Sequence, residues 1–306
     1  MREMKRTARK LAIGLKSSSI QKDPRIRELR FAMHQIRHSP LTVFGLILIA
    51  SLVFISIIPS SFLPYPKDLE SVNFPSKLQP PSWQHLFGTD DMGRDVFTRV
   101  IYGSRISLSM SLIVVAIAMS IGVPLGGVAG YLGGRVDDLI MRLTDIFFAI
   151  PSVLLALAIV SALGPSIVNA TIAIGVSWWP FYTRLVRGQV LSIREETYVE
   201  AARAIGAKDR RIILRHILPN CAPIIIVQSS MQFGYAILML GTLGFLGLGA
   251  RPPAPEWGVM IGAGRVYIPD WWWIATFPGL AIFIAVLGFC LVGDGLRDVL
   301  DPRLRR

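Results

Sequence analysis

Charged residues are scarce in this sequence of 306 amino acids. Asp, Glu, Lys and Arg together make up 17% of the chain, whereas they make up about a quarter of an average soluble domain. Apolar residues reach 52%, and the mean hydropathy is +0.53. This balance excludes an ordinary soluble domain and indicates a protein for which the lipid bilayer is the solvent.

Several chemical signatures are also missing. The sequence has no phosphate-binding G-x-x-x-x-G-K-[ST] motif, so it is not expected to hydrolyse ATP itself. His34 and His38 lie one helical turn apart, but no Glu follows the first, and a metal site is not expected. The two cysteines, Cys221 and Cys290, are predicted to pack as free thiols rather than to form a disulfide. No nucleophile-and-base constellation favours a membrane-embedded enzyme.

Stretches without charge predict the membrane spans, because a helix needs about 20 apolar residues to cross the hydrocarbon core. Five such stretches occur, at residues 41–58, 106–134, 146–183, 217–250 and 271–293. The third contains the turn signal Gly164-Pro165-Ser166, which splits it into two spans. The sequence therefore predicts an all-α integral membrane protein with six transmembrane helices.

The distribution of Lys and Arg predicts the orientation. With the N-terminus inside, the inner segments carry 25 of these residues and the outer segments carry 7. Because positive charge is retained on the cytoplasmic side of membranes, both the N and the C termini are predicted to be cytoplasmic.

These boundaries divide the chain into five predicted segments. Residues 1–40 form a basic cytoplasmic tail, which either lies along anionic lipid or is solvated and only fixes the topology. The remaining segments are the first transmembrane helix at 41–58, an extracytoplasmic segment at 59–105, a five-helix transmembrane core at 106–297 and a cytoplasmic C-terminal tail at 298–306.

Small and kinking residues predict how the helices pack. Gly126, Gly130 and Gly134 recur every four residues, which predicts the close approach of a neighbouring helix. The glycines within residues 241–249 do not join a strand to a helix, so they predict dense helix packing rather than a nucleotide site. Prolines at three positions are predicted either to kink their helices or to act as hinges, namely Pro124, Pro151 and Pro278.

Polar residues are few inside the predicted spans. None is ionisable at depth, which argues against a carrier that is driven by an ion gradient. Gln228 and Gln232 lie one turn apart in the fifth span, where they either line a polar translocation path or form hydrogen bonds between helices. On the outer side, Asp90, Asp91 and Asp95 are expected to be neutralised by the nearby Arg94 and Arg99.

The cytoplasmic loop at residues 186–220 is the most informative part of the sequence. Its second half reads YVEAARAIGAKDRRIILRHILPN and predicts two short helices around Gly206, which can adopt the left-handed conformation that ends a helix. Tyr198, Ala202 and Ile205 are predicted to share one face, and Pro219 is predicted to stop the second helix. Such a loop is either a lever between two spans or an amphipathic segment that rests on lipid head groups.

This loop closely resembles the EAA motif of ABC importer permeases, E-A-A-x3-G-x9-I-x-L-P. The matching residues are Glu200, Ala201, Ala202, Gly206, Leu218 and Pro219. His216 stands where isoleucine is usual, but the surrounding RHILPN is similar to the version in peptide-type permeases.

Further segments resemble the C-type permease subunit of dipeptide and oligopeptide ABC importers, and together they cover nearly the whole chain after residue 35. They are FGTD at 87–90, GRD at 93–95, SRISL at 104–108, LGLG at 246–249, PEWG at 255–258, GDGLRD at 293–298 and LDPR at 300–303. The resemblance implies the type I ABC importer permease fold. It also implies a second homologous permease, two cytoplasmic ABC ATPases that bind ATP and Mg²⁺, and an extracytoplasmic solute-binding protein.

The expected function is therefore that of a permease without catalytic residues, metal ligands or a cofactor of its own. The motif residues of the loop would couple it to the ATPases, and Gln228 and Gln232 would belong to the translocation path. The solute is expected to be a dipeptide, an oligopeptide or another solute carried by such permeases, including nickel, glutathione and oligosaccharides. The alternative is an ATP-independent secondary transporter or channel.

Overall fold

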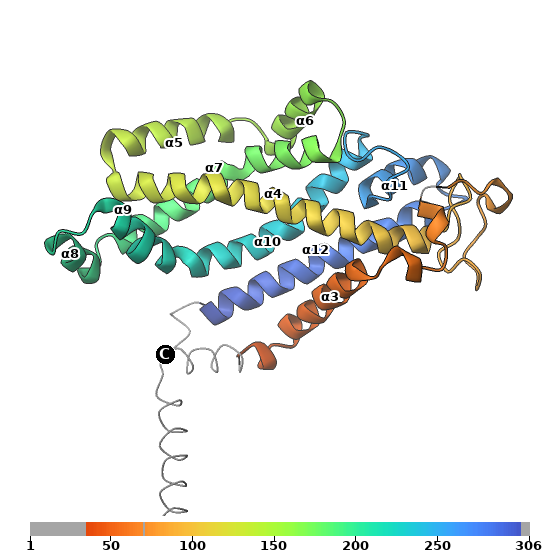
Figure 1. Ribbon diagram of the computed structural model, residues 1–306, viewed down its shortest axis with the longest axis horizontal. Helices are drawn as coiled ribbons and strands as arrows, with labels where there is room; N and C mark the ends of the chain where they lie inside the picture. Colours follow the sequence, from red (N-terminus) through yellow and green to blue (C-terminus); the bar gives the residue numbers. More distant parts are fainter. Residues whose placement is uncertain (1–34, 70, 301–306) are drawn as a thin grey trace, which may run out of the picture.

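The computed structural model describes residues 35–69 and 71–300, and most of both predicted tails lies outside these ranges. The described elements are helical and form an elongated bundle (Figure 1). The α-helices are α3 (Pro40–Ile57), α4 (Val96–Leu132), α5 (Gly134–Phe148), α6 (Ser152–Leu163), α7 (Ile167–Ile193), α8 (Thr197–Ala204), α9 (Asp209–Ile212), α10 (Leu218–Phe245), α11 (Trp257–Gly264) and α12 (Trp273–Leu300).

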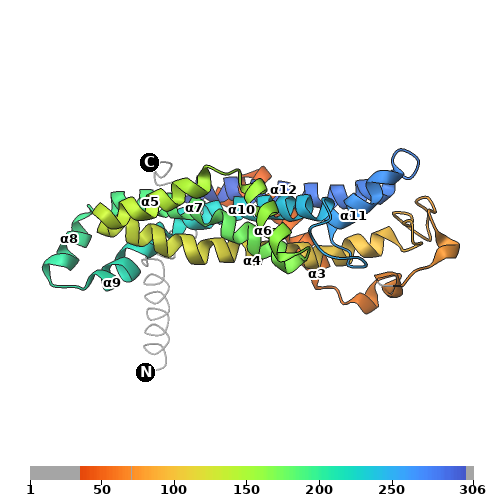
Figure 2. The same cartoon turned by 90° about the horizontal axis from the view of Figure 1, so that it is seen from above.

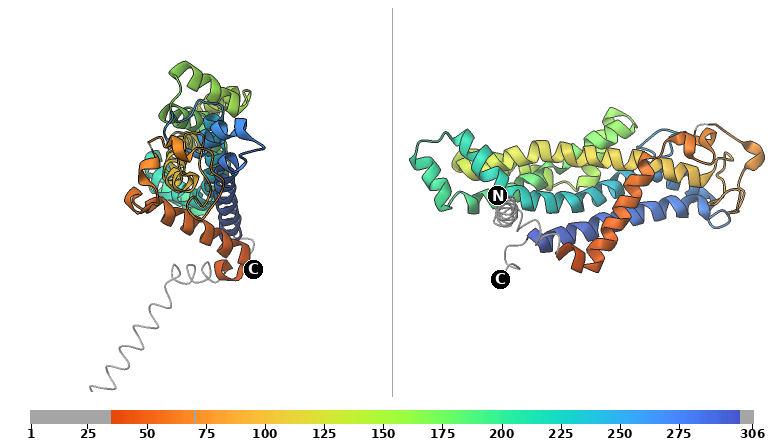
Figure 3. Two further views of the ribbon diagram at one scale, coloured as in Figure 1. Left: turned by 90° about the vertical axis from the view of Figure 1, so that its right-hand side faces the viewer. Right: turned by 60° about the horizontal axis from the view of Figure 1, so that its bottom comes forward.

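Long helices run along the molecule and position its two ends. Helices α4, α7, α10 and α12 follow the long axis, and α3 packs along α12 (Figure 3). Helices α8 and α9 project at one end, whereas α11 and the segment between α3 and α4 form the other end (Figure 2). Functional residues at the two ends are therefore separated by the length of the bundle.

Four described helices are long and apolar enough to cross a membrane. They are α3, α4, the continuous helix at Asp209–Phe245 and α12, and the bent pair of α5 and α6 makes a fifth if it is counted as one span. Helix α7 has 27 residues, but Arg184 and Arg187 lie in its second half. The predicted turn at Gly164-Pro165-Ser166 is confirmed, because α6 ends at Leu163 and Ser166 caps α7.

The predicted continuous span at residues 146–163 is wrong. The chain bends by 83° between α5 and α6, and Pro151 lies at the break. Proline disfavours the helical conformation of the preceding residue and has no N–H to continue the hydrogen-bond ladder. The predicted kink at Pro151 is thus a break, whereas Pro124 and Pro278 remain inside α4 and α12.

Helix α4 begins at Val96, ten residues before the predicted start of the second span. The Asp95 side chain caps it by accepting a hydrogen bond of 2.7 Å from the N–H of Thr98. The charged residues Arg99 and Arg105 lie within this helix, where backbone carbonyls accept hydrogen bonds from both. The charges that ended the predicted span therefore do not end the helix.

Glycines hold α4 against α7. A Cβ atom at Gly126 would lie 2.5 Å from the carbonyl oxygen of Thr183, and one at Gly130 would lie 2.8 Å from the Val190 side chain. The close packing predicted for these two positions is confirmed. Gly134 has no such neighbour and instead begins α5 with a φ of +54°, so the packed stripe includes Gly122 in its place.

Candidate functional site

The cytoplasmic loop of the sequence prediction forms the end of the bundle beyond α7 and α10 (Figure 2). Helix α8 ends at Ala204, and Gly206 has a φ of +79°, as the sequence predicted. No atom lies within 4 Å of the place that a Cβ would take at Gly206. The backbone conformation rather than a lack of space therefore favours glycine here.

The motif residues have two different environments. Glu200, Ala201 and Gly206 are exposed, so they are accessible to another protein. Ala202 is buried with Val199 in a cluster that joins the loop to the bundle. The motif thus combines an outward face with an inward anchor.

Ile205 is the functional candidate that sequence reasoning misplaced. It was predicted to share a face with Ala202, but 85% of its surface is exposed while Ala202 is buried. Ile205 follows the last helical residue and precedes the left-handed Gly206, so the helical periodicity does not extend to it. Its position directly before a helix-ending glycine was the signal in the sequence that could have indicated its exposure.

The predicted end of the second loop helix at Pro219 is wrong. Helix α9 continues through a π-helical turn at Ile213–Ile217 into α10, and Pro219 lies in the first turn of α10. The wider π turn changes the hydrogen-bond pattern just before the proline, which itself lacks a donor. Pro219 is exposed, and Leu218 lies beside Gly127 of α4.

A cavity of about 590 Å³ lies where the bend between α5 and α6 meets α7 and α10. Its wall is mainly apolar and aromatic and includes Phe148, Trp178, Phe181, Gln232, Tyr235 and Thr242. Gln228 does not line this cavity. Both glutamines are half-buried, and neither side chain forms a hydrogen bond to another part of the described chain. The structure thus gives no support to the predicted interhelical hydrogen bonds within this subunit.

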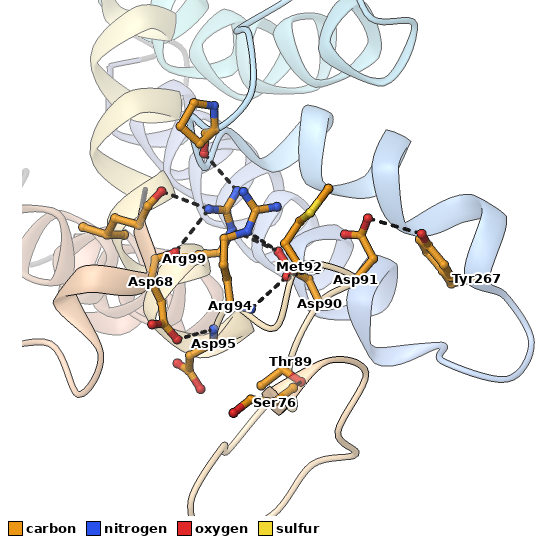
Figure 4. Close-up of polar contacts among 12 residues, drawn as sticks. Asp68, Ser76, Thr89, Asp90, Asp91, Met92, Arg94, Asp95, Arg99 and Tyr267 are labelled. Carbon is orange, nitrogen blue, oxygen red and sulfur yellow. Dashed lines mark hydrogen bonds and ion pairs between the residues drawn. The ribbon is translucent and has the colours of Figure 1, made fainter. Parts of the chain in front are cut away.

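A polar cluster fixes the opposite end of the molecule (Figure 4). Asp90 forms an ion pair of 2.7 Å with Arg94 and lies 3.7 Å from Arg99. Asp91 also interacts electrostatically with Arg99 and accepts a hydrogen bond from Tyr267, whereas Asp95 pairs with His85 instead of an arginine. In the described part of the chain, no group of three or more His, Cys, Asp or Glu side chains could hold a metal ion.

Buried Arg99 ties this cluster to two distant loops. Its guanidinium donates to the carbonyl oxygen of Leu69 at 3.1 Å and to that of Pro253 at 3.1 Å. The segment between α3 and α4 and the loop before α11 are thereby held to the first turns of α4. The cluster is therefore an architectural feature of this end.

Because of the Asp68 carboxylate in this cluster, we expect the stability of the folded protein to depend on pH. Burial raises its pKa above the ordinary value of 3.8, although the N–H of Asp95 donates a hydrogen bond to it. A raised carboxyl pKa means that the folded state binds the proton more tightly, so this contribution to stability is lost as the pH rises above 3.8.

We expect Asp68→Asn to remove this loss while keeping an oxygen that can accept the Asp95 N–H. Thermal unfolding of both proteins in detergent should show that the unfolding temperature of the variant rises relative to that of the wild type between about pH 4 and about pH 7. An unfolding-temperature difference that stays constant over this range would contradict the role of Asp68.

Comparisons with known proteins agree with the arrangement described above. Residues 122–306 match the family described as binding-protein-dependent transport system inner membrane component. The chain is 49% identical over 270 residues to the probable D,D-dipeptide transport system permease protein DdpC of Escherichia coli, covering 88% of this chain and 89% of the relative. It is 48% identical over 278 residues to the dipeptide transport system permease protein DppC of Alkalihalophilus pseudofirmus, covering 90% of each.

The fold also resembles that of a solved transporter. A chain of the MetNI methionine ABC transporter in an inward-facing conformation superposes with a TM-score of 0.52 at 20% identity, covering 67% of this chain and 96% of that chain. The apolar helices, the family match and the extended identity to the two permeases lead to one conclusion. This chain belongs to the family of binding-protein-dependent transport system inner membrane components and is a multi-pass permease of the cytoplasmic membrane.

Proposed function

We infer that this chain is the transmembrane subunit of an ATP-driven ABC importer that carries peptides or a related small solute. The observation that carries this proposal is the loop at the end of the bundle, where Glu200, Ala201 and Gly206 are exposed on a segment anchored by Ala202. The high identity to permeases named for dipeptide transport supports the solute class.

The proposed topology has six spans with both termini in the cytoplasm. The spans are α3, α4, the bent pair of α5 and α6, α7, the helix at Asp209–Phe245 and α12. Helix α7 is about 40 Å long, which is sufficient to cross a hydrocarbon core of about 30 Å. The excess of Lys and Arg places α8 and α9 on the cytoplasmic side and the cluster around Arg99 on the outer side.

The proposed assembly supplies the energy from outside this chain. Two cytoplasmic ATPases bind ATP and Mg²⁺, and one of them binds the exposed face of the loop. A solute-binding protein delivers the solute at the outer end. Closure of the ATPases moves the loop as a body and shifts the permease pair between inward-facing and outward-facing states. This chain provides a path and a lever, and it holds no cofactor.

The cavity beside Gln232 is the proposed contribution of this chain to the translocation path. Its aromatic and apolar wall suits peptide side chains of varied shape, and Gln232 and Thr242 offer hydrogen bonds to a peptide backbone. Gln228 lies one turn away on α10 and extends this polar strip toward the cytoplasmic end. A second, homologous permease would form the other wall.

Substitution of the exposed loop tip tests the proposed function. We expect Ile205→Glu to reduce the ATPase that copurifies with the complex by at least about ten-fold, since an apolar anchor at the centre of an interface contributes about 2 kcal/mol or more. Ile205 is 85% exposed, so the subunit itself should fold normally. Gly206→Val should act in the same direction by straining the left-handed backbone.

The matched control is Val266→Glu, which changes an exposed apolar residue at the opposite end of the molecule. Val266 is 71% exposed, and this variant should retain the ATPases at the wild-type level. Retention of the ATPases by both loop variants would contradict the proposed docking face.

A further inference from the structure

The cytoplasmic loop is fastened to a helix that is not its neighbour in the sequence. The chain connects α8 and α9 directly to α7 and α10. The C-terminal end of α4 nevertheless contacts the loop through Tyr131, whose hydroxyl donates a hydrogen bond of 2.8 Å to the Asp209 carboxylate. Tyr131 is only 7% exposed, although Asp209 lies at the surface.

The ring of Tyr131 also contacts the first loop helix. The guanidinium carbon of Arg203, in the last turn of α8, lies 5.7 Å from the centre of this ring, within the range of a cation–π interaction. One side chain of α4 therefore contacts α8 through its ring and α9 through its hydroxyl.

Apolar packing around Tyr131 makes these contacts part of one body. Tyr131 belongs to a buried cluster with Val199 and Ala202 of α8, Ile212 of α9, and Val186 and Val190 of α7. The three loop residues have exposed fractions of 6% or less, so the inner face of the loop is fully covered. A displacement of α8 cannot occur without moving the end of α4 or breaking this cluster.

The end of α4 is in turn joined to α7. Arg194, at the end of α7, donates a hydrogen bond of 3.0 Å to the carbonyl oxygen of Gly130, and the side chain of Val190 packs against the same glycine. Helices that pack this closely move together, because their backbones are too near each other for one helix to slide past the other. Motion of the loop therefore reaches the α4–α7 pair as well as α10.

We propose that Tyr131 is a positioning residue that clamps the coupling loop to α4 and so transmits ATPase movement to the α4–α7 pair. This inference rests on the proposed function of the loop. Because Tyr131 is buried on the inner face, it is not needed for ATPase docking. Loss of the clamp should therefore uncouple ATP hydrolysis from transport and leave the assembly intact.

The test uses the complete complex in proteoliposomes, with a loaded solute-binding protein and a dipeptide as the transported probe. Tyr131→Phe removes only the hydroxyl, and we expect peptide uptake per ATP hydrolysed to fall about five-fold, the scale of one lost hydrogen bond. Asp209→Ala should lower this ratio to a similar degree, and the double variant should fall little further. Asp209→Asn keeps an acceptor oxygen and should restore most of the wild-type ratio.

Tyr102→Phe is the matched control, since Tyr102 lies near the other end of α4 and its hydroxyl forms no hydrogen bond within the described residues. ATPases should copurify normally with every variant in the series. A wild-type ratio in both Tyr131→Phe and Asp209→Ala would overturn the clamp. Failure of the proposed function is distinct from this result, because it would already be seen in the wild-type complex as uptake that does not need ATP.

Discussion

Gly258→Val is expected to reduce the amount of folded protein in the membrane severely. A Cβ atom at Gly258 would lie 2.2 Å from the carbonyl oxygen of Gly241 and 2.5 Å from its Cα atom. Both obstructing atoms are backbone, so no side chain can rotate away. Helix α11 would have to separate from α10, at a cost that we expect to be about 3 kcal/mol or more.

This cost is large because α11 is also held to α4 and has a buried cap of its own. The indole N–H of Trp257 donates to the carbonyl oxygen of Val100 at 2.9 Å, and buried Glu256 caps α11 by accepting from the N–H groups of Gly258 and Val259. Separation of α11 would strain the hydrogen bond between Trp257 and Val100 of α4 as well. Since the free energy of unfolding is typically about 5–15 kcal/mol, a loss of this size should leave much less of the protein folded.

The measurement is the yield and unfolding temperature of the detergent-purified variant. Gly279→Ala is the matched control, because Gly279 lies inside α12 and a Cβ atom there would have no other atom within 4 Å. This control should change stability by no more than about 1 kcal/mol. Wild-type yield and unfolding temperature for Gly258→Val would show that the α10–α11 contact is not as tight as described.

Local features of the sequence were sufficient to predict part of the fold. The absence of charge identified most of the long helices, because the cost of burying charge in hydrocarbon is a property of each segment by itself. The break at residues 164–166 and the left-handed Gly206 were predictable because both are set by local backbone preferences. The tight packing of glycines 241 and 244 also followed from their lack of side chains.

Features that depend on tertiary partners were not predictable in the same way. Helix α4 extends past Arg99 because carbonyls from residues 69 and 253, distant in the sequence, accept its hydrogen bonds. Helices α9 and α10 form one continuous helix from Asp209 to Phe245 because a π turn joins them before Pro219. Neither compensation is visible in a local pattern of hydrophobicity.

In the candidate site, too, local features were predictable and tertiary contacts were not. The motif located the loop, since spacing along the chain carries that information. Tyr131 and Asp209 are 78 residues apart, and no motif connects them. Their contact required the three-dimensional arrangement of α4 beside the loop.

The largest expected effect on transport is the complete dependence of uptake on the partner subunits. This chain has no phosphate-binding motif, and among its described residues no group of three or more His, Cys, Asp or Glu side chains could hold a metal ion. Under the proposed function, the work is expected to enter through the loop at α8 and α9. The proposed function therefore predicts that the permease cannot concentrate a solute without its ATPases.

Uptake of a labelled dipeptide into proteoliposomes tests this central claim most directly. The subunit alone, and the subunit with a second permease, should give no accumulation above empty liposomes. The complete complex with its ATPases and loaded binding protein should accumulate peptide only when Mg-ATP is present on the side of the α8–α9 loop. Accumulation by this chain alone, or by the complete complex without ATP, would contradict the account.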